Sequence, residues 1–375
     1  MSATAGIPEA VVREHIARLC ELMKRDGLNA VIVFHPSNMA AFTGTPHSTW
    51  DRLTCGAVTR DGEAIVVCPA FEQPGIDLDT RVPHVHTWQE HEDAYALLAQ
   101  VLARLGVRSG RVGVDGRMWL DAWARFQAAF EGPTLCNGEA LLREVRICKS
   151  PAELELMRAA HRRGEQVFLE LQRRVRPGVT ERQLAREIKD HFEPRGLLAH
   201  PMVQTGPNGA APHHAIDDTP LAEGHTVVID SVTVTSGYHN DLTRTYAVGS
   251  PSARARQAYR AVRAAQAAAI AAARPGVPCQ ELDRAARKVI ADAGFGPYFI
   301  HRLGHGIGIE CHEPPYLVEG NAETLRAGMC ITIEPGIYVP GEFGIRIEDD
   351  VAITPDGCEV IRGELPTDVT TAYDA

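Results

Sequence analysis

Several features that define whole classes of protein are missing from this chain of 375 residues. Its longest nearly apolar stretch, residues 264–273, is far shorter than the roughly 18 residues that cross a bilayer, so no membrane partner is expected. Nine cysteines are scattered singly without a Cys-x-x-Cys pair, which disfavours both a disulfide framework and a thiolate zinc site. Charged residues at helical spacing near the N-terminus exclude a secretory signal. A cytoplasmic location is therefore expected.

Charge of one sign is not concentrated in any block either. Lys plus Arg total 38 and Asp plus Glu total 48, so the formal net charge is −10. No nucleic acid partner is therefore expected. Apolar residues (45%) and charged residues (23%) occur in the proportions of a folded globular protein, and the length predicts two or three domains.

The first part of the chain alternates between helical and strand patterns. Apolar residues recur at helical spacing over residues 8–26, and Gly27 then ends the predicted helix. Short strands are expected at 30–34, 63–68 and 112–114, and helices near 93–105 and 118–130. These patterns predict an α/β domain over residues 1–148.

A second domain, residues 149–375, is predicted to begin with a capped helix. Ser150 suits the N-cap, Pro151 the first helical position, and Glu153 the reciprocal partner in a capping box. The string Arg-Pro-Gly-Val at 176–179 recurs at 274–277. Each copy follows a long helical pattern, opens another helix, and is followed by two β-rich stretches. An α-α-β-β unit duplicated once predicts a pseudo-two-fold axis and a site assembled from both halves.

The first β-rich stretch predicts a hairpin that carries two carboxylates. If its turn centres on residues 236–237, Asp230 lies opposite Thr243 and Asp241 lies opposite Val232. The two acids are then diagonal neighbours on one face of the hairpin. Charges in so apolar a strand are costly unless a positive group neutralises them, and a divalent cation would do so.

The second β-rich stretch predicts a comparable pair of strands around a loop at 340–341. In that register Glu334 and Glu348 face one another, and His305 adds an imidazole from the Gly-rich string 304–308. Any one acid alone is more simply a satisfied edge residue, but four acids with an imidazole provide the ligands of a two-metal centre. The glycine spacing superficially suggests a phosphate loop. It lacks the helix and Lys-Ser/Thr context, so close packing explains it better.

Several strings in order resemble the motifs of a known family. They are Val228-Ile229-Asp230, Asp241-Leu242-Thr243-Arg244-Thr245, His301-Arg302-Leu303-Gly304-His305-Gly306-Ile307-Gly308, His312-Glu313-Pro314-Pro315, Thr332-Ile333-Glu334-Pro335-Gly336-Ile337-Tyr338 and Arg346-Ile347-Glu348-Asp349-Asp350. Together they look like the signature of the prolidase, aminopeptidase P and methionine aminopeptidase family, the "pita-bread" metallopeptidases. The resemblance covers about residues 150–375, and the preceding part is similar to the family's creatinase-like N-terminal domain. It implies an α/β (α+β) fold with an internally duplicated catalytic domain.

The resemblance also implies a ligand set for two divalent metal ions. The matching positions are Asp230, Asp241, His305, Glu334 and Glu348. In this family pattern Asp241 and Glu348 bridge the ions, a bridging hydroxide is the nucleophile, and Glu334 shuttles protons. Four carboxylates suit Mn²⁺, whereas the imidazole also permits Co²⁺, Zn²⁺ or Fe²⁺.

Three further residues match groups that surround the metals in the family. His213 matches a pocket histidine that holds substrate or leaving amine, His312 the histidine that hydrogen-bonds the substrate carbonyl, and Arg346 an arginine behind the ligands. The implied reaction is hydrolysis of the Xaa-Pro bond in dipeptides or at peptide N-termini. The implied partner is a small peptide with proline at its second position, and a homodimer is expected because symmetric dimers are common.

Two positions depart from the family pattern. The family usually has Asp-x-Gly at the first ligand, whereas Val232 occupies the glycine position here, and ligation by Asp230 is expected to survive. Proline dipeptidases commonly place a carboxylate-binding arginine ahead of the Glu-Pro-Gly motif. Arg326 is the only arginine in residues 318–329 and is more simply a surface residue. The sequence therefore leaves dipeptidase and longer-chain aminopeptidase open.

Other reactive residue types have simpler explanations. Four histidines outside the ligand and pocket sets are expected to be loop or structural hydrogen-bonding residues: His225, His239, His214 and His301. Of these, His239 and His214 also lie where they could touch substrate. Cys311 follows the glycine string but has no dedicated base, so it is expected to be a structural thiol.

Two other functions stay open from the sequence. The same scaffold could hydrolyse a small non-peptide amide or act as a lyase, and some proteins of this fold only bind ligands. Such binding proteins typically break the ligand set, whereas all five positions are kept here.

Overall fold

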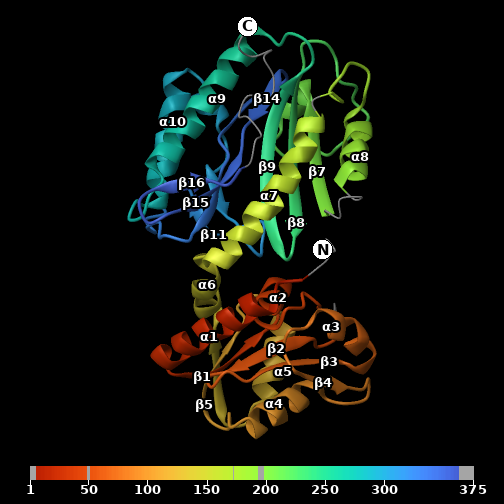
Figure 1. The fold of residues 1–375 in the computed structure, drawn as a ribbon, viewed down its shortest axis with the longest axis vertical. Coiled ribbons are helices and arrows are strands. Elements are labelled where there is room, and N and C mark those ends of the chain that lie inside the picture. Colours follow the sequence, from red (N-terminus) through yellow and green to blue (C-terminus); the bar gives the residue numbers. More distant parts are fainter. Residues whose placement is uncertain (1–5, 49–50, 172, 193–197, 363–375) are drawn as a thin grey trace. The chain divides into compact units, whose positions relative to one another are not determined.

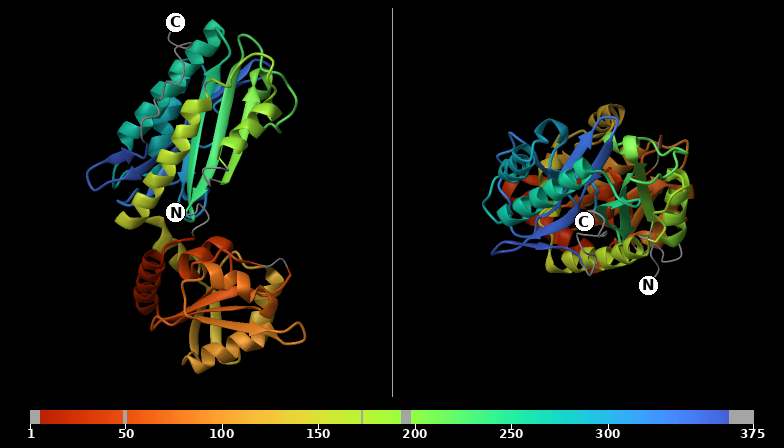
Figure 2. Two further views of the ribbon diagram at one scale, coloured as in Figure 1. Left: turned by 45° about the vertical axis from the view of Figure 1, so that its right-hand side comes forward. Right: turned by 90° about the horizontal axis from the view of Figure 1, so that it is seen from above.

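The computed structural model describes residues 6–48, 51–171, 173–192 and 198–362. These residues form two compact units, divided between Arg146 and Ile147 (Figures 1 and 2). The predicted boundary lies between residues 148 and 149, and the predicted outer limits at residues 1 and 375 fall outside the described residues. Within the described ranges, no helix combines the length and the apolar character that a membrane span needs.

The N-terminal unit is a six-stranded sheet with helices along both faces (Figure 1). Its strands, in sheet order, are β4 (His84–Trp88), β3 (Ala64–Pro69), β2 (Cys55–Thr59), β1 (Leu28–Val33), β5 (Gly110–Val114) and β6 (Pro133–Asn137). Its helices are α1 (Glu9–Asp26), α2 (Pro36–Thr43), α3 (Gln73–Asp79), α4 (Ala94–Arg104), α5 (Leu120–Ala129) and α6 (Glu139–Ile147). The predicted α/β organisation is confirmed, and the elements that were not predicted are α2, α3, α6, β2, β4 and β6.

Helix α1 shows how local sequence determines an element of this unit. Its apolar stripe is buried, with Leu19 and Met23 fully inaccessible. The helix ends where predicted, because Gly27 adopts the left-handed conformation (φ 69°) and its N–H donates to the Met23 carbonyl. On the sheet, Ala30 and Ile32 of β1 pack in the same apolar core as residues of α4 and α5.

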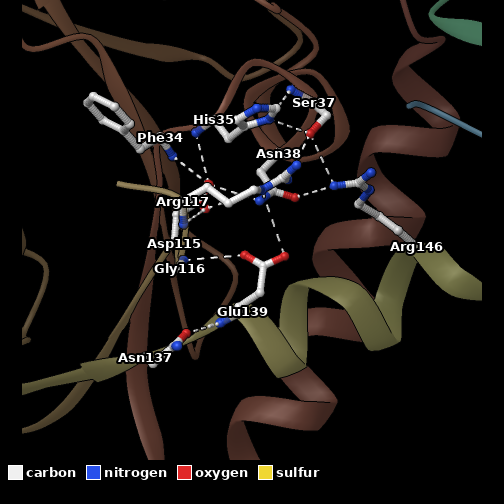
Figure 3. A network of polar contacts seen from close by, with 10 residues as sticks. All are labelled: Phe34, His35, Ser37, Asn38, Asp115, Gly116, Arg117, Asn137, Glu139 and Arg146. Carbon is white, nitrogen blue, oxygen red and sulfur yellow. Dashed lines mark hydrogen bonds and ion pairs between the residues drawn. The ribbon is translucent and has the colours of Figure 1, made fainter. Parts of the chain in front are cut away.

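A polar network fills the edge at which β1 and β5 end (Figure 3). The Asp115 carboxylate accepts hydrogen bonds from the N–H of Phe34 (3.1 Å) and His35 (2.9 Å) and from Nδ2 of Asn38 (2.8 Å). Nη1 of Arg146 donates to Oδ1 of Asn38 (2.7 Å). Burial favours a higher pKa for Asp115, but these hydrogen bonds outweigh it and the pKa is lowered. Open α/β sheets often bind ligands at this edge, which the chain's own side chains occupy here.

The C-terminal unit contains three sheets and four long helices (Figure 1). Its helices are α7 (Pro151–Leu171), α8 (Glu181–Phe192), α9 (Ala253–Ala272) and α10 (Cys279–Asp292). One sheet is β7 (Leu198–Thr205), β8 (Thr226–Thr235) and β9 (Tyr238–Ala247). A second is β11 (Glu313–Leu317), β10 (Gly304–Gly306), β12 (Cys330–Ile333), β15 (Asp349–Ile353) and β16 (Cys358–Val360), and a third pairs β13 (Gly336–Val339) with β14 (Phe343–Arg346).

The predicted helix start at α7 is confirmed in atomic detail. The Ser150 N–H donates to Oε2 of Glu153 (2.8 Å), and the Glu153 N–H donates to Oγ of Ser150 (3.4 Å). Helix α7 then runs across β8 and β9 (Figure 1).

The internal duplication appears in the hydrogen bonds of the two Arg-Pro-Gly-Val turns. The Gly178 N–H donates to the Leu221 carbonyl (2.9 Å), and the Gly276 N–H donates to the Leu325 carbonyl (2.8 Å). In each half the leucine N–H returns to the valine that follows the glycine. Both glycines have positive φ, 86° and 83°, which explains why the same turn residues recur. Each turn lies between two long helices, as predicted.

Candidate metal centre

The first hairpin has the predicted register. Asp230 pairs with Thr243, and Val232 pairs with Asp241, in the antiparallel ladder of β8 and β9. The two acids are therefore diagonal neighbours on one face, and their residues are only 7% and 5% exposed. The strand β7, which the sequence did not predict, adds to β8 from the other side.

The second pair of strands has the predicted register but is interrupted. The β12–β15 and β13–β14 ladders share one register, in which Glu334 and Glu348 occupy opposite positions. Neither glutamate belongs to a strand, because Pro335 cannot donate a ladder hydrogen bond. The Glu348 N–H donates instead to the carbonyl of Thr243 (3.1 Å), so this break is joined to the first hairpin.

His305 reaches the acids from β10. The residue is buried, its Nδ1 lies 3.1 Å from the Gly306 carbonyl, and its Nε2 lies 3.5 Å from Oε1 of Glu334. A Cβ atom on Gly304 would lie 2.1 Å from the carbonyl oxygen of Thr332. The glycine spacing is thus explained by close packing between neighbouring strands rather than by phosphate binding.

All five predicted ligands gather in two overlapping groups of side chains. Ligand atoms of Asp230, Asp241 and Glu348 lie within 4.8 Å of one another, and so do those of His305, Glu334 and Glu348. Glu348 belongs to both groups. The residues come from both halves of the duplicated unit, as the pseudo-two-fold arrangement predicts.

Three buried carboxylate oxygens in this cluster indicate a cation. Among the described residues, Oδ1 of Asp230, Oδ1 of Asp241 and Oε1 of Glu348 have no hydrogen-bond partner. The second oxygen of each has one, from Arg346, Cys311 and Thr243 respectively. Buried polar atoms are normally paired, and unpaired carboxylate oxygens are the ligands that hard divalent cations take. The residues present therefore fit a divalent metal.

The electrostatics of the cluster point the same way. Burial, followed by the charges of neighbouring carboxylates, raises the pKa of Asp241 and Glu348 well above the ordinary range. Burial is also the main reason that the pKa of Glu334 is raised to about 8. Burial and the nearby His312 lower the pKa of His305 to about 3, so its imidazole is neutral and can act as a ligand. The carboxyl groups of this buried cluster can be ionised together only if a nearby positive charge offsets their mutual repulsion.

Arg346 holds one of these acids in place. Its Nη2 donates to Oδ2 of Asp230 (2.6 Å), and its Nη1 donates to the Tyr338 hydroxyl (3.0 Å). The same hydroxyl lies 2.9 Å from Nε2 of His301, whose Nδ1 faces the Arg302 carbonyl. Burial lowers the pKa of His301 to about 4, so the ring is neutral and its Nε2 accepts a hydrogen bond from the tyrosine hydroxyl. His301 is therefore a structural hydrogen-bonding residue, as expected.

The two predicted pocket histidines are more accessible than the acids. His312 is exposed, and its ring centroid lies 4.1 Å from that of His305. His213 is exposed in the loop that follows the 3₁₀ turn Gly206–Ala210. The close approach of Gly209 and Gly344 holds that turn against β14, because a Cβ on Gly344 would lie 1.7 Å from the Gly209 carbonyl oxygen.

Sequence reasoning missed several residues that act on this site. Arg302 packs over the Tyr316 ring at 4.4 Å, and its charge helps to lower the pKa of His312 after burial. Thr243 contacts Glu348, and Asp350 contacts the backbone of Asp241. Arg302 stands beside His301 in the motif string. The sequence gives no signal for the contacts that Thr243 and Asp350 make across the sheets.

Cys311 lies closer to the acids than its sequence position indicated. Its Sγ donates to Oδ2 of Asp241 (3.2 Å), and the residue is half-buried. Burial, then the Asp241 charge, raises the pKa of the thiol. A thiol held protonated in this way is a poor nucleophile, in agreement with the structural interpretation.

A separate group of potential ligands, Glu181, His214 and Asp217, has a different explanation. The Glu181 carboxylate accepts the N–H of Thr205 (2.7 Å), and Asp217 accepts the N–H of Thr219 (2.7 Å). These acids order the loop around residues 205–219 through backbone hydrogen bonds, so they carry no argument for a second metal site.

Comparison with known proteins assigns families to both parts of the chain. Residues 155–355 match the model of metallopeptidase family M24, and residues 15–148 match that of the creatinase/prolidase N-terminal domain. A probable dipeptidase PepE of Mycobacterium tuberculosis is 36% identical over 88% of this chain and 89% of its own length. An Xaa-Pro dipeptidase of Lactobacillus helveticus is 32% identical over 92% and 95% of the two chains.

Solved structures give the same picture. Dipeptidase PepE from Mycobacterium ulcerans superposes with a TM-score of 0.86 at 34% identity, covering 97% of this chain and 98% of that one. Prolidase from Thermococcus sibiricus gives a TM-score of 0.84 at 30% identity, covering 93% and 96%. An X-Pro aminopeptidase from Thermotoga maritima gives 0.85 at 27% identity, covering 94% and 98%.

Proposed function

Because this chain belongs to metallopeptidase family M24, we propose that it hydrolyses the Xaa-Pro peptide bond of dipeptides at a centre of two divalent metal ions. The proposed ligands are Asp230, Asp241, His305, Glu334 and Glu348. The observation that carries the proposal is the set of buried carboxylate oxygens without partners, which converge from the two hairpins.

Bound cations would act as Lewis acids and lower the pKa of a coordinated water molecule. The chain's own residues would do the rest. Arg346 fixes one oxygen of Asp230, which leaves the other directed to the cluster. We assign to the Glu334 carboxylate, which is less buried than the other three acids, the transfer of a proton from water to the departing nitrogen.

The exposed histidines would bind substrate. His312 lies against His305, so its imidazole can donate to the carbonyl oxygen on which negative charge develops. His213 lies near enough to His312 and His301 to contribute to the lowering of the pKa of both. Burial is the largest cause of each shift. We assign His213 to the substrate or the leaving amine.

A dipeptide with proline at its second position is the proposed substrate because relatives named dipeptidases align over nearly the whole chain. The similar X-Pro aminopeptidase makes longer peptides the alternative that an assay must separate. Mn²⁺ is the proposed metal, since four of the five ligands are carboxylates. A cytoplasmic location would keep the nine cysteines reduced, and a homodimer is proposed as the assembly.

The proposal is tested with the purified protein supplied with Mn²⁺ and assayed on Ala-Pro, Gly-Pro, Ala-Ala and a longer Xaa-Pro-Xaa peptide. We expect turnover of the two proline dipeptides and much slower cleavage of Ala-Ala. Preference for the longer peptide would identify an aminopeptidase. Failure to cleave any of the peptides, with metal shown to be bound, would overturn the proposed function and favour a small-amide hydrolase or a lyase.

A further inference from the structure

Two buried ionisable residues behind the proposed metal centre have no role in the ligand set. His161 lies on α7 and Asp350 on β15, and both are 0% exposed. Nε2 of His161 lies 2.5 Å from Oδ2 of Asp350. A pair of ionisable side chains so far from water is costly to bury, and it contributes little to stability compared with apolar packing. Its position therefore calls for an explanation.

The same carboxylate oxygen contacts the backbone of a proposed ligand. The Asp241 N–H donates to Oδ2 of Asp350 (3.2 Å), so this oxygen joins His161 to the residue that carries an unpartnered oxygen towards the cluster. Ligand atoms of Asp241 lie within 4.8 Å of those of Asp230 and Glu348, and they also lie within 4.8 Å of those of His305 and His312. A shift of its backbone would therefore displace a carboxylate that lies among potential ligands from both halves of the duplicated unit.

Helix α7 is shaped to bring His161 to this place. Gly164, one turn further along, has its Cα close to β9, and a Cβ there would lie 3.3 Å from Oδ1 of Asn240, the neighbour of Asp241. The absence of a side chain at that position lets the helix lie close to the strand. His161 then projects from the same stretch of helix onto Asp350.

The hydrogen bonds of Asp350 explain why a donor is needed on α7. Its Oδ2 contacts Nε2 of His161 and accepts from the Asp241 N–H, whereas its Oδ1 has no hydrogen-bond partner among the described residues. Without His161, the buried carboxylate would lose its side-chain donor and would be free to shift. His161 supplies that donor, so the carboxylate can keep one oxygen on the Asp241 N–H.

We propose that His161 and Asp350 are positioning residues that fix the backbone of Asp241 and thereby strengthen metal binding. This inference rests on the proposed function, since it concerns the same metal centre. Outer partners of metal ligands typically change metal affinity by about 10- to 100-fold when they are removed. His161→Ala is expected to weaken Mn²⁺ binding by that amount.

The test is a Mn²⁺ titration of the metal-free full-length protein by calorimetry, together with thermal unfolding of the metal-free form. His161→Gln places an amide N–H near Asp350 and is expected to recover most of the affinity. The matched control is His15→Ala, which removes a buried histidine of the N-terminal unit that bonds to the Ala41 carbonyl. It is expected to lower thermal stability and leave Mn²⁺ affinity unchanged.

The outcomes separate the two ideas. A purely structural role would lower the unfolding temperature of His161→Ala while its Mn²⁺ dissociation constant stays within about twofold of the unsubstituted protein, and this would overturn the inference alone. An unsubstituted protein that binds no Mn²⁺ would overturn the proposed function as well. If His161→Ala does not fold, Asp350→Asn is titrated instead. A Mn²⁺ dissociation constant within about twofold of the unsubstituted protein would again overturn the inference.

Discussion

Thr243 and Glu348 are joined twice, once through the backbone and once through the side chains. The Glu348 N–H donates to the Thr243 carbonyl (3.1 Å), and Oγ1 of Thr243 donates to Oε2 of Glu348 (2.6 Å). These bonds connect the two hairpins of the duplicated unit at the carboxylate that belongs to both ligand groups. The geometry of the candidate metal centre therefore depends on a contact between its two halves.

Removal of the Thr243 hydroxyl tests this contact. Thr243→Val leaves Oε2 of Glu348 without its donor, so we expect weaker binding of Mn²⁺, by about 10-fold or more. Thr243→Ser keeps the hydroxyl and should bind Mn²⁺ as the unsubstituted protein does. Calorimetric titration of the metal-free proteins makes the comparison. Equal affinities for the valine and serine variants would show that the hydroxyl does not orient Glu348.

Asp241→Asn is expected to remove most of the peptidase activity. The substitution takes a negative charge from the centre of the cluster and leaves an amide nitrogen or a single neutral oxygen facing the metals. Mn²⁺ retained after dialysis should fall, together with kcat on Ala-Pro. The control is Asp218→Asn, which alters a largely exposed acid of the same unit, paired with Arg182. Similar losses in both variants would argue against a ligand role for Asp241.

Cys311→Ser should leave activity within a few-fold of the unsubstituted protein. The serine hydroxyl can donate to Asp241 as the thiol does, and no step of the proposed chemistry needs sulfur. The rate of Ala-Pro hydrolysis at saturating Mn²⁺ is the measurement. An inactive Cys311→Ser protein that still binds Mn²⁺ would mean that the nucleophile has been misassigned.

Gly304→Ala is expected to disrupt the C-terminal unit. Its Cβ would lie 2.1 Å from the Thr332 carbonyl oxygen. Both atoms belong to the backbones of neighbouring strands, β10 and β12, which cannot move apart without disrupting their packing. Gly357→Ala is the control, because a Cβ there meets nothing within 4 Å. We expect reduced soluble yield and lower thermal stability for the first variant only. A Gly304→Ala protein with unaltered stability would contradict the packing explanation of the glycine spacing.

Asp115→Asn should destabilise the N-terminal unit in a pH-dependent way. The folded state lowers the Asp115 pKa, so the ionised carboxylate contributes stability above the unfolded value of about 3.9 and loses it as pH falls through the lower folded value. We expect a loss of about 1–3 kcal/mol at neutral pH that shrinks towards pH 3. All four tryptophans precede residue 147, so their fluorescence reports this unit.

The control for that experiment is Asp121→Asn, an exposed acid of α5 that pairs with Arg125. It should change the free energy of unfolding little at either pH, as surface pairs usually do. A difference between Asp115→Asn and the unsubstituted protein that stays constant from pH 7 to pH 3 would show that the Asp115 charge is not the cause.

Local sequence determined much of this fold. The capping box at Ser150 and Glu153, the stop of α1 at Gly27 and the register of the β8–β9 hairpin all follow from side chains a few residues apart. The spacing of the acids also predicted which four would meet, because the pleat of a strand places alternate residues on one face. Short-range rules were sufficient wherever the deciding contact was itself short in sequence.

Strands that depend on distant partners were not predicted. Strand β7 lies at the edge of its sheet and pairs with β8, and β2, β4 and β6 of the N-terminal unit are short strands without a strong alternating pattern. Pro335 was visible in the sequence as an interruption of the strand. The sequence did not show the consequence, which is that the Glu348 N–H donates a hydrogen bond to the Thr243 carbonyl. Such pairings are selected by packing across the unit.

By itself, the sequence determined the metallopeptidase motifs, the duplicated helix-turn units and the identity of the acids that converge, since each is encoded by residue type and local spacing. Only the tertiary structure decided which oxygen of each acid is held and which is left for a cation, because Arg346, Cys311 and Thr243 reach those oxygens from other strands and loops. It also decided that His161 meets Asp350, a contact between residues 189 positions apart. No local pattern encodes such a contact, since it forms only when α7 packs against the sheet.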